Sequence, residues 1–256
     1  IFFVLITKLY INHMLKIPLH FDEAQYWSWS KQIAWGYFSK PPFLAWCINL
    51  ISNICGNGQG CIRSLSPFFY IATSLGIFYS SYKITNKINN SIFASIIFLL
   101  MPGITFSSLF ISTDVPLIFF STLVGAIVVK LYIEDKKQKF YIYILLALAL
   151  ALATLSKYAA FYLVPSILLA SAISSRLRRV LYKKEIVYTI LFYFIFITPN
   201  VIWNFNNGFV TFNHTFDNAN INTLSFSIYK PIQFIMIQFL VFGLFSFLFI
   251  FKIMIE

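Results

Sequence analysis

The sequence contains little charge. Only 11% of its 256 residues are Asp, Glu, Lys or Arg, and Asp and Glu together number eight. A soluble globular domain carries about a quarter charged residues, so this shortage argues against a soluble domain. The net charge of +11 does not indicate a nucleic-acid partner either, because the basic residues lie in short loops between apolar runs rather than in a binding stripe.

Cysteine motifs and nucleotide-binding motifs are also missing. The three cysteines have no spacing typical of a metal site, and no glycine-rich or Walker-type nucleotide loop is present. Cys55 and Cys61 flank a flexible segment, 56–60, so they either pair in a disulfide or stay free. Residues 1–7 have no basic segment before them and no cleavage site after them, which favours a truncated helix over a signal peptide.

Long apolar runs fill most of the chain. Hydrophobic residues make up 59% of the sequence, aromatic residues 20%, and several runs are long enough to cross ~30 Å of hydrocarbon. We therefore predict an all-α, polytopic membrane protein with about eight transmembrane helices. We expect residues 1–256 to form an N-terminal transmembrane module, truncated at both ends. The predicted spans are 1–13 (incomplete), 63–82, 91–110, 115–133, 140–156, 158–174, 186–203 and 232–251.

The basic residues predict the orientation of these spans. They concentrate in every second loop: Lys83 and Lys87; Lys130, Lys136, Lys137 and Lys139; and Arg176, Arg178, Arg179, Lys183 and Lys184. By the positive-inside rule these loops are cytoplasmic, so the long loop 14–62 faces the periplasm or lumen. The ionisable residues expected on that outer side are Asp22, Glu23, Lys40, Asp114, Lys157, His214 and Asp217.

The first outer loop begins with two adjacent acids. Asp22 precedes good helix formers and has Gln25 three residues later, which is the pattern of an N-cap with a capping box. The alternative is a chemical role for Asp22. Aromatic residues that favour the membrane boundary follow, so we predict an interfacial helix over 23–34.

Lys40 lies directly before two prolines. The apolar run 42–52 is too short to span a bilayer and predicts a second interfacial helix. A lysine at the start of a helix opposes the helix dipole, and a bound anion such as phosphate would offset that cost. The alternative is a lysine that snorkels to the headgroup level.

These residues resemble a known family. Asp22-Glu23-Ala24, Tyr26-Trp27, Trp35-Gly36-Tyr37 and Ser39-Lys40-Pro41-Pro42 resemble the first periplasmic loop of the bacterial RgtA/B/C/D-like glycosyltransferases. Those enzymes belong to the GT-C class, with the dolichyl-phosphate-mannose protein mannosyltransferases and the aminoarabinose transferase of lipid A. Further resemblances follow in order at Thr113-Asp114-Val115-Pro116, Ser156-Lys157-Tyr158-Ala159-Ala160, Pro199-Asn200, Trp203-Asn204, Asn207-Gly208 and Phe212-Asn213-His214-Thr215.

The resemblance implies transfer of a sugar from a polyprenyl-phosphate carrier, at the periplasmic face of a bacterial inner membrane. The implied acceptor is a glycan, a lipid or a protein. Loop 14–62 would carry the catalytic motif, with Asp22 as the essential acid and Glu23 and Asp114 as supporting acids. Lys40 and Lys157 would meet the carrier phosphate.

A divalent metal is a further implication of the resemblance. His214 lies in a segment similar to one that supplies a histidine ligand in the aminoarabinose transferase. That enzyme has a glutamate where this chain has Ser39, a departure that puts the metal site in doubt.

The residue chemistry suits sugar transfer. A carboxylate such as Asp22 can take a proton from the acceptor, and Lys40 can stabilise the charge that develops on the phosphate leaving group. Plainer interpretations remain: Asp114 could be an N-cap, Lys157 could snorkel, and His214 could be an ordinary polar side chain. The lack of a nucleotide motif fits a lipid-phosphate donor.

Two other functions fit the composition. A transporter or flippase for a lipid-linked saccharide predicts ionisable residues in mid-span and repeated halves. The middles of 63–82, 115–133 and 140–156 lack ionisable residues, and no internal repeat is visible. The other alternative is a non-catalytic scaffold that retains the fold.

Overall fold

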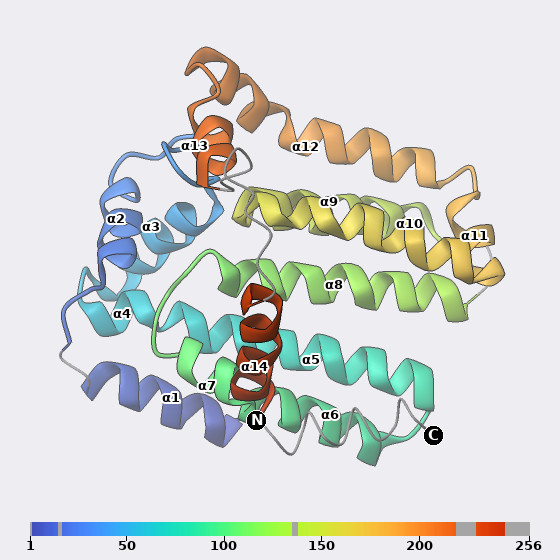
Figure 1. Cartoon of the computed structure of the whole chain (residues 1–256), viewed down its shortest axis with the longest axis horizontal. Helices are drawn as coiled ribbons and strands as arrows, with labels where there is room; N and C mark the ends of the chain where they lie inside the picture. The colour runs from blue at the N-terminus through green and yellow to red at the C-terminus, as the bar shows by residue number, and fades with distance from the viewer. Residues whose placement is uncertain (1, 15–16, 135–137, 219–228, 244–256) are drawn as a thin grey trace.

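The computed structural model describes residues 2–14, 17–134, 138–218 and 229–243, and every regular element within them is a helix. The longer helices lie side by side as a bundle, and three shorter helices gather at one end of it, α2 (Phe21–Trp29), α3 (Phe43–Cys55) and α13 (Val210–Asn218) (Figure 1). The predicted all-α class is therefore confirmed. The bundle helices are α1 (Phe2–Met14), α5 (Leu65–Thr85), α6 (Ile88–Leu100), α8 (Asp114–Ile133), α9 (Phe140–Ser156), α10 (Leu163–Ile173) and α12 (Ile186–Asn206).

Three helical segments are long and apolar enough to cross a membrane: Gln59–Thr85, Asp114–Ile133 and Ile186–Asn206. The first combines α4 (Gln59–Arg63) with α5. Neighbouring helices pack as α6–α5–α8–α9–α12. The alanines of α9 at 147, 149, 151 and 153 are buried, and small side chains of this kind let membrane helices approach closely.

Large apolar side chains cover the outside of the bundle. Phe194 on α12 is 58% exposed and Leu169 on α10 is 69% exposed, and both belong to a long series of exposed Phe, Leu and Ile residues. A soluble protein rarely exposes so much contiguous apolar surface, whereas a lipid-facing surface requires it. The exposed surface therefore agrees with the composition in indicating a membrane protein.

The predicted span 91–110 is wrong as a single helix. Helix α6 ends at Leu100, and α7 (Pro102–Ser107) begins after Met101, whose backbone is extended with ψ 132°. A residue before proline avoids the helical region, and proline suits the first turn of a new helix. The chain thus breaks at Met101, leaving α6 with 13 residues.

The predicted span 232–251 lies partly outside the described residues. Helix α14 (Tyr229–Phe242) packs against α7 and crosses the direction of the bundle helices (Figure 1). Gly103 allows this contact, because a Cβ there would lie 2.9 Å from the Val241 side chain. Residues 244–251 of the predicted span are not described.

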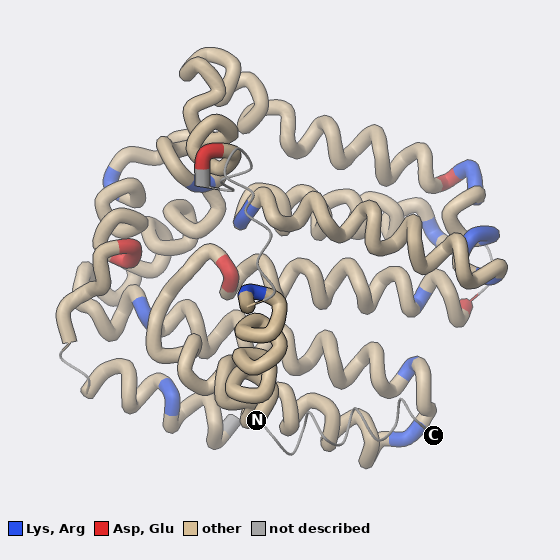
Figure 2. The backbone as a smooth tube through the Cα atoms, viewed as in Figure 1, with Lys and Arg blue, Asp and Glu red and all other residues tan. Residues whose placement is uncertain are grey.

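The charged segments separate between the two ends of the bundle. At one end of the bundle, charged residues lie on the ends of α5 and α8, on α11 (Ser175–Leu181) and at the start of α12 (Figure 2). The starts of α2 (Phe21–Trp29) and α8 and the end of α9 lie at the other. The second group includes the outer-side acids predicted from the sequence. The orientation in a membrane stays a prediction.

Candidate functional site

Two helices are present in the first loop where two were predicted, with shifted bounds, and their interfacial position stays a prediction. Helix α2 covers Phe21–Trp29 and α3 covers Phe43–Cys55. The disulfide Cys55–Cys61, with Cα atoms 5.8 Å apart, joins the end of α3 to α4. Gly56, at φ +87°, provides the left-handed backbone that ends α3.

The capping box predicted at Asp22 is wrong. The N-cap of α2 is His20, and Glu23 is the third helical residue, where its Oε2 accepts a 2.9 Å hydrogen bond from the His20 backbone N–H. Asp22 lies inside the first turn, with an exposed side chain. Its carboxylate is therefore not needed to cap the helix.

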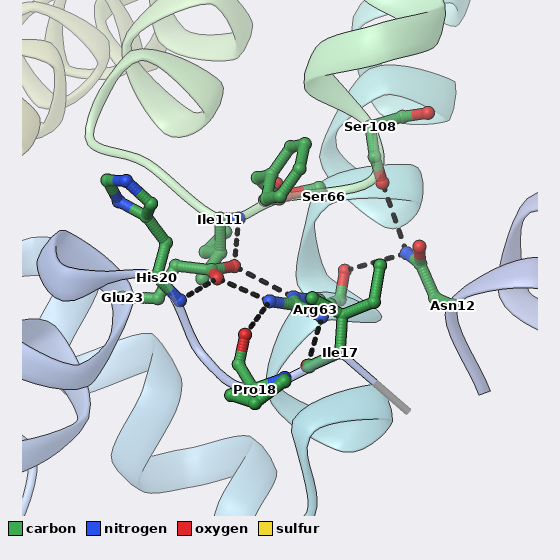
Figure 3. Close-up of polar contacts among 10 residues, drawn as sticks. Asn12, Ile17, Pro18, His20, Glu23, Arg63, Ser66, Ser108 and Ile111 are labelled. Carbon is green, nitrogen blue, oxygen red and sulfur yellow. Dashed lines mark hydrogen bonds and ion pairs between the residues drawn. The ribbon is translucent and has the colours of Figure 1, made fainter. Parts of the chain in front are cut away.

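Glu23 is buried, in contrast to its neighbour Asp22. It forms an ion pair with Arg63, and both side chains are only 2% exposed (Figure 3). Burial alone would raise the pKa of the Glu23 carboxyl. The hydrogen bonds from Arg63 and from the backbone amides of His20 and Ile111, together with the Arg63 charge, lower that pKa below its usual value. Glu23 is therefore an ionised, fully paired group.

Tyr26, for which the sequence analysis predicted no chemical role, is buried on α2 one helical turn after Asp22. Burial, the largest cause, and the nearby charges of Asp22 and Asp114 together raise the pKa of its hydroxyl to about 12, while the neighbouring Thr113 hydroxyl opposes the shift. The charges of Asp22 and Asp114 therefore both act on this hydroxyl. The signal in the sequence was the spacing of four residues between Asp22 and Tyr26, which puts both on one helix face.

Asp114 pairs with Lys157. Lys157 Nζ donates to Asp114 Oδ1 at 2.7 Å, and the side chains are 33% and 50% exposed. The N-cap of α8 is Thr113, so Asp114 is not the N-cap proposed as its plainer interpretation. The pair joins the start of α8 to the end of α9, two segments 43 residues apart in the sequence.

Lys157 and Lys40 line one cavity. This cavity has a volume of about 640 Å³, and Lys157 in its wall pairs with Asp114. Its walls combine two cations with polar groups and aromatic rings, a lining suited to an anion attached to an apolar group. The lining residues are Ser39, Lys40, Pro41, Lys157, Tyr158, Ala159, Phe161, Tyr162, Phe212, Asn213, Thr215 and Phe216.

Distant segments hold the loop that leads to Lys40. Asn200 Nδ2 donates to the Trp35 carbonyl at 2.5 Å, and Thr211 Oγ1 donates to the Tyr37 carbonyl at 2.6 Å. Between them, Gly36 meets Trp203 so closely that a Cβ would lie 2.3 Å from the indole. Only glycine permits this contact, which ties the loop to α12 and α13 (Val210–Asn218).

His214 lies on α13 rather than in the polar loop that was expected. Its ring contacts that of Phe38, with centroids 5.1 Å apart at a steep angle. Within the described part of the chain, no group of three or more His, Cys, Asp or Glu residues gathers in a way that could hold a metal ion. These residues do not fit a metal site, and the metal role of His214 stays a prediction.

The structure thus brings together four of the residues predicted for the site. The charges of Asp22 and Asp114 both act on Tyr26, Asp114 pairs with Lys157, and Lys157 shares a cavity with Lys40. Glu23 belongs to a separate, buried pair. The site as a whole combines exposed carboxylates with an adjacent cationic, aromatic cavity.

Known proteins are similar to this chain in sequence or in fold. Residues 39–203 match the family model described as dolichyl-phosphate-mannose-protein mannosyltransferase. The chain is 28% identical over 223 residues to lipid A galacturonosyltransferase RgtD of Rhizobium johnstonii, covering 87% of this chain and 46% of that protein. The crystal structure of ArnT from Cupriavidus metallidurans in the apo state has a similar fold, with a TM-score of 0.64 at 17% identity over 81% of this chain and 41% of that one. The chain spans less than half the length of either protein.

Proposed function

Since the chain belongs to the dolichyl-phosphate-mannose-protein mannosyltransferase family, we propose that it forms part of a membrane glycosyltransferase that takes its sugar from a polyprenyl-phosphate carrier. The acceptor would be modified on the periplasmic face of a bacterial inner membrane. RgtD is named for lipid A, so a lipid A-type glycolipid is the acceptor to test first. The contact between Asp114 and Lys157 carries the proposal, because it joins the exposed acids to the cationic cavity.

The donor phosphate would bind in the cavity between Lys40 and Lys157. Both ammonium groups line it, and an anion there would offset their mutual repulsion. The aromatic walls, which include Phe161, Tyr162 and Phe216, would contact the first units of the prenyl chain. The donor thus accounts for both the charge and the apolar lining of the cavity.

The acceptor would react on the side of the acids. Asp22 takes the proton from the acceptor hydroxyl or amine as that atom attacks the anomeric carbon of the sugar. The bond from the anomeric carbon to the phosphate oxygen breaks, and its electron pair leaves with the polyprenyl phosphate. Lys40 and Lys157 stabilise the negative charge that develops on that phosphate. Attack opposite to the leaving group inverts the anomeric configuration.

Tyr26 and Asp114 would support this transfer. Because the pKa of Tyr26 is about 12, its hydroxyl stays protonated at neutral pH. It can therefore donate a hydrogen bond to the carboxylate of Asp22 or to that of Asp114. Asp114 holds Lys157 at the rim of the cavity through their 2.7 Å contact. We give Asp22 the role of base because its carboxylate is exposed and has no part in a cap or an ion pair among the contacts described above.

The disulfide agrees with an extracytoplasmic site. Cys55 and Cys61 lie in the same outer loop as Asp22 and Lys40, and disulfides persist in oxidising compartments such as the bacterial periplasm. The same loop would meet reducing conditions if it faced the cytoplasm. This supports the orientation that the basic loops predict.

A complementation experiment tests the proposed function. The gene is deleted in its host and replaced by the unaltered full-length protein or by its Asp22→Asn variant, and lipid A and carrier lipids are analysed by mass spectrometry. We expect the unaltered protein to restore a sugar on an envelope acceptor, and the variant to express normally without restoring it. Normal restoration by Asp22→Asn would contradict the assignment of Asp22 and favour the transporter alternative.

A further inference from the structure

We propose that the buried pair of Glu23 and Arg63 is a positioning device that sets the exposed carboxylates of Asp22 and Asp114 at a working separation. The inference rests on the proposed function, and it gives Glu23 a different task from the supporting acid that the family resemblance implied. It also assigns a role to Arg63, which sequence reasoning did not single out.

Every hydrogen bond of the Glu23 carboxylate goes to the protein. Oε1 accepts from Arg63 Nε at 3.0 Å and from the Ile111 backbone N–H at 3.0 Å. Oε2 accepts from Arg63 Nη2 at 2.6 Å and from the His20 backbone N–H at 2.9 Å. A carboxylate held by four donors and 2% exposed cannot reach a substrate without breaking this arrangement.

Arg63 fastens the same carboxylate to three other segments (Figure 3). Its Nη1 and Nη2 donate to the carbonyls of Ile17 and Pro18, each at 3.0 Å, and its guanidinium lies 5.5 Å from the Phe110 ring centre. Asn12 of α1 donates to the Arg63 carbonyl at 3.3 Å and to the Ser108 carbonyl at 3.1 Å. The pair therefore connects α1, the segment before α2, α4 and the segment before α8.

Two of these connections lead directly to the site. Glu23 is the neighbour of Asp22 on α2, and Ile111 is three residues before Asp114. Ile111 and Val115, which lie on either side of Asp114 in the sequence, belong with Tyr26 of α2 to one buried hydrophobic cluster. The separation of the two exposed acids is thus set by two links, one through Tyr26 and one through Glu23. Displacing catalytic groups by ~1 Å costs about 100-fold in rate, so loss of the Glu23 link is expected to impair catalysis.

The test removes the pair without leaving a lone buried charge. A single change would strand the partner's charge and could prevent folding, whereas removing both charges usually keeps the fold. The variant is Glu23→Gln with Arg63→Met in the full-length protein, since glutamine still offers an oxygen to the backbone amides of His20 and Ile111. The matched control is Lys83→Met with Glu134→Gln, which removes an ion pair at the opposite end of the bundle.

Two measurements follow, one of which needs no activity. In hydrogen exchange we expect the amides of 108–113 to exchange at least about 10-fold faster in the double variant, while those of α9 and α12 exchange as in the unaltered protein and the control variant shows no change. In transfer assays we expect kcat to fall about 100-fold with an unchanged KM for the donor. The pH–rate profile should keep both limbs, because no proton-transfer group has been removed.

The outcomes distinguish the positioning role of Glu23 and Arg63 from the proposed glycosyltransferase function. Unchanged exchange in 108–113 would overturn the positioning role, whether or not the protein transfers a sugar. Faster exchange with full activity would also overturn it, because the coupling would then have no consequence for catalysis. Loss of one limb of the pH profile would instead make Glu23 a proton-transfer residue. If exchange accelerates but the unaltered protein transfers no sugar, the mechanical link stands and the proposed function fails.

Discussion

The two ends of the helix bundle use ion pairs in different surroundings. At the end that carries α2, α3 and α13, Glu23 and Arg63 are 2% exposed and join four segments, and Asp114 and Lys157 border a cavity. At the opposite end, Lys83 and Glu134 are 30% and 33% exposed and lie among basic loop residues. Burial and neighbouring segments, rather than the residue types, therefore indicate where a charge has a specific task.

The largest effect is expected from Asp22→Asn, which tests whether the first end is a reaction site. Removing a general base costs about 10²- to 10⁴-fold, and we expect kcat to fall by about 10³-fold with little change in donor KM. Steady-state transfer assays with purified full-length protein measure this. Asp217→Asn, at another exposed acid of the same end, is the control and should transfer normally. An equal loss of kcat in both variants would contradict the assignment of Asp22 as the general base.

A smaller effect is expected from Lys40→Gln, which tests the cavity. Loss of one cation that stabilises the leaving phosphate costs about 100-fold in kcat/KM for the donor. The control is Lys31→Gln, because Lys31 lies in the same loop but packs over the Trp27 ring, 4.6 Å from its centre. If Lys31→Gln impaired donor use as strongly as Lys40→Gln, the cavity would not be the phosphate site.

The contact between Asp114 and Lys157 calls for a double-mutant cycle with Asp114→Asn and Lys157→Met. Each side chain is at least one-third exposed, so water screens the pair and its contribution to stability should stay below about 1 kcal/mol. We expect each single change to lower kcat/KM about 10-fold and the double change to cost no more than either. Additive losses would show that the two residues act separately.

Acid sensitivity of stability should distinguish the buried pair. The folded-state pKa of Glu23 is below its usual value, so the pair contributes stability above the unfolded pKa of about 4.5, and this contribution is lost as pH falls through the folded pKa. The double variant Glu23→Gln with Arg63→Met should therefore show a weaker fall in melting temperature below pH 4.5 than the unaltered protein. If the melting temperatures of both proteins fell equally below pH 4.5, Glu23 would not be ionised in the folded protein.

The smallest effect is expected at the opposite end. Lys83→Met removes an ion pair that is about one-third exposed, and such pairs contribute little. We expect transfer and melting temperature to match the unaltered protein within error. A loss of transfer activity in Lys83→Met would show that the two ends of the bundle are coupled and that an exposed ion pair also matters for transfer.

Local sequence patterns were sufficient for much of the fold. The two short helices of the first loop were predicted because the aromatic and apolar runs 23–34 and 42–52 are bounded by glycine and proline. The alternation of basic loops was readable because charges are costly in hydrocarbon and collect between spans. The start of α2 was misplaced because the sequence does not show that Glu23, rather than Asp22, would turn back to the helix start.

The composition and spacing of the residues by themselves determined an all-helical membrane protein and placed Asp22, Lys40, Asp114 and Lys157 in loops of one side, because these properties depend on near neighbours and on the bilayer. Only the tertiary structure decided that Asp22 is exposed while Glu23 is paired with Arg63, and that the charges of Asp22 and Asp114 both act on the buried Tyr26. These features depend on contacts between segments 40 or more residues apart, such as Glu23 with Arg63 and with Ile111, which no local pattern encodes.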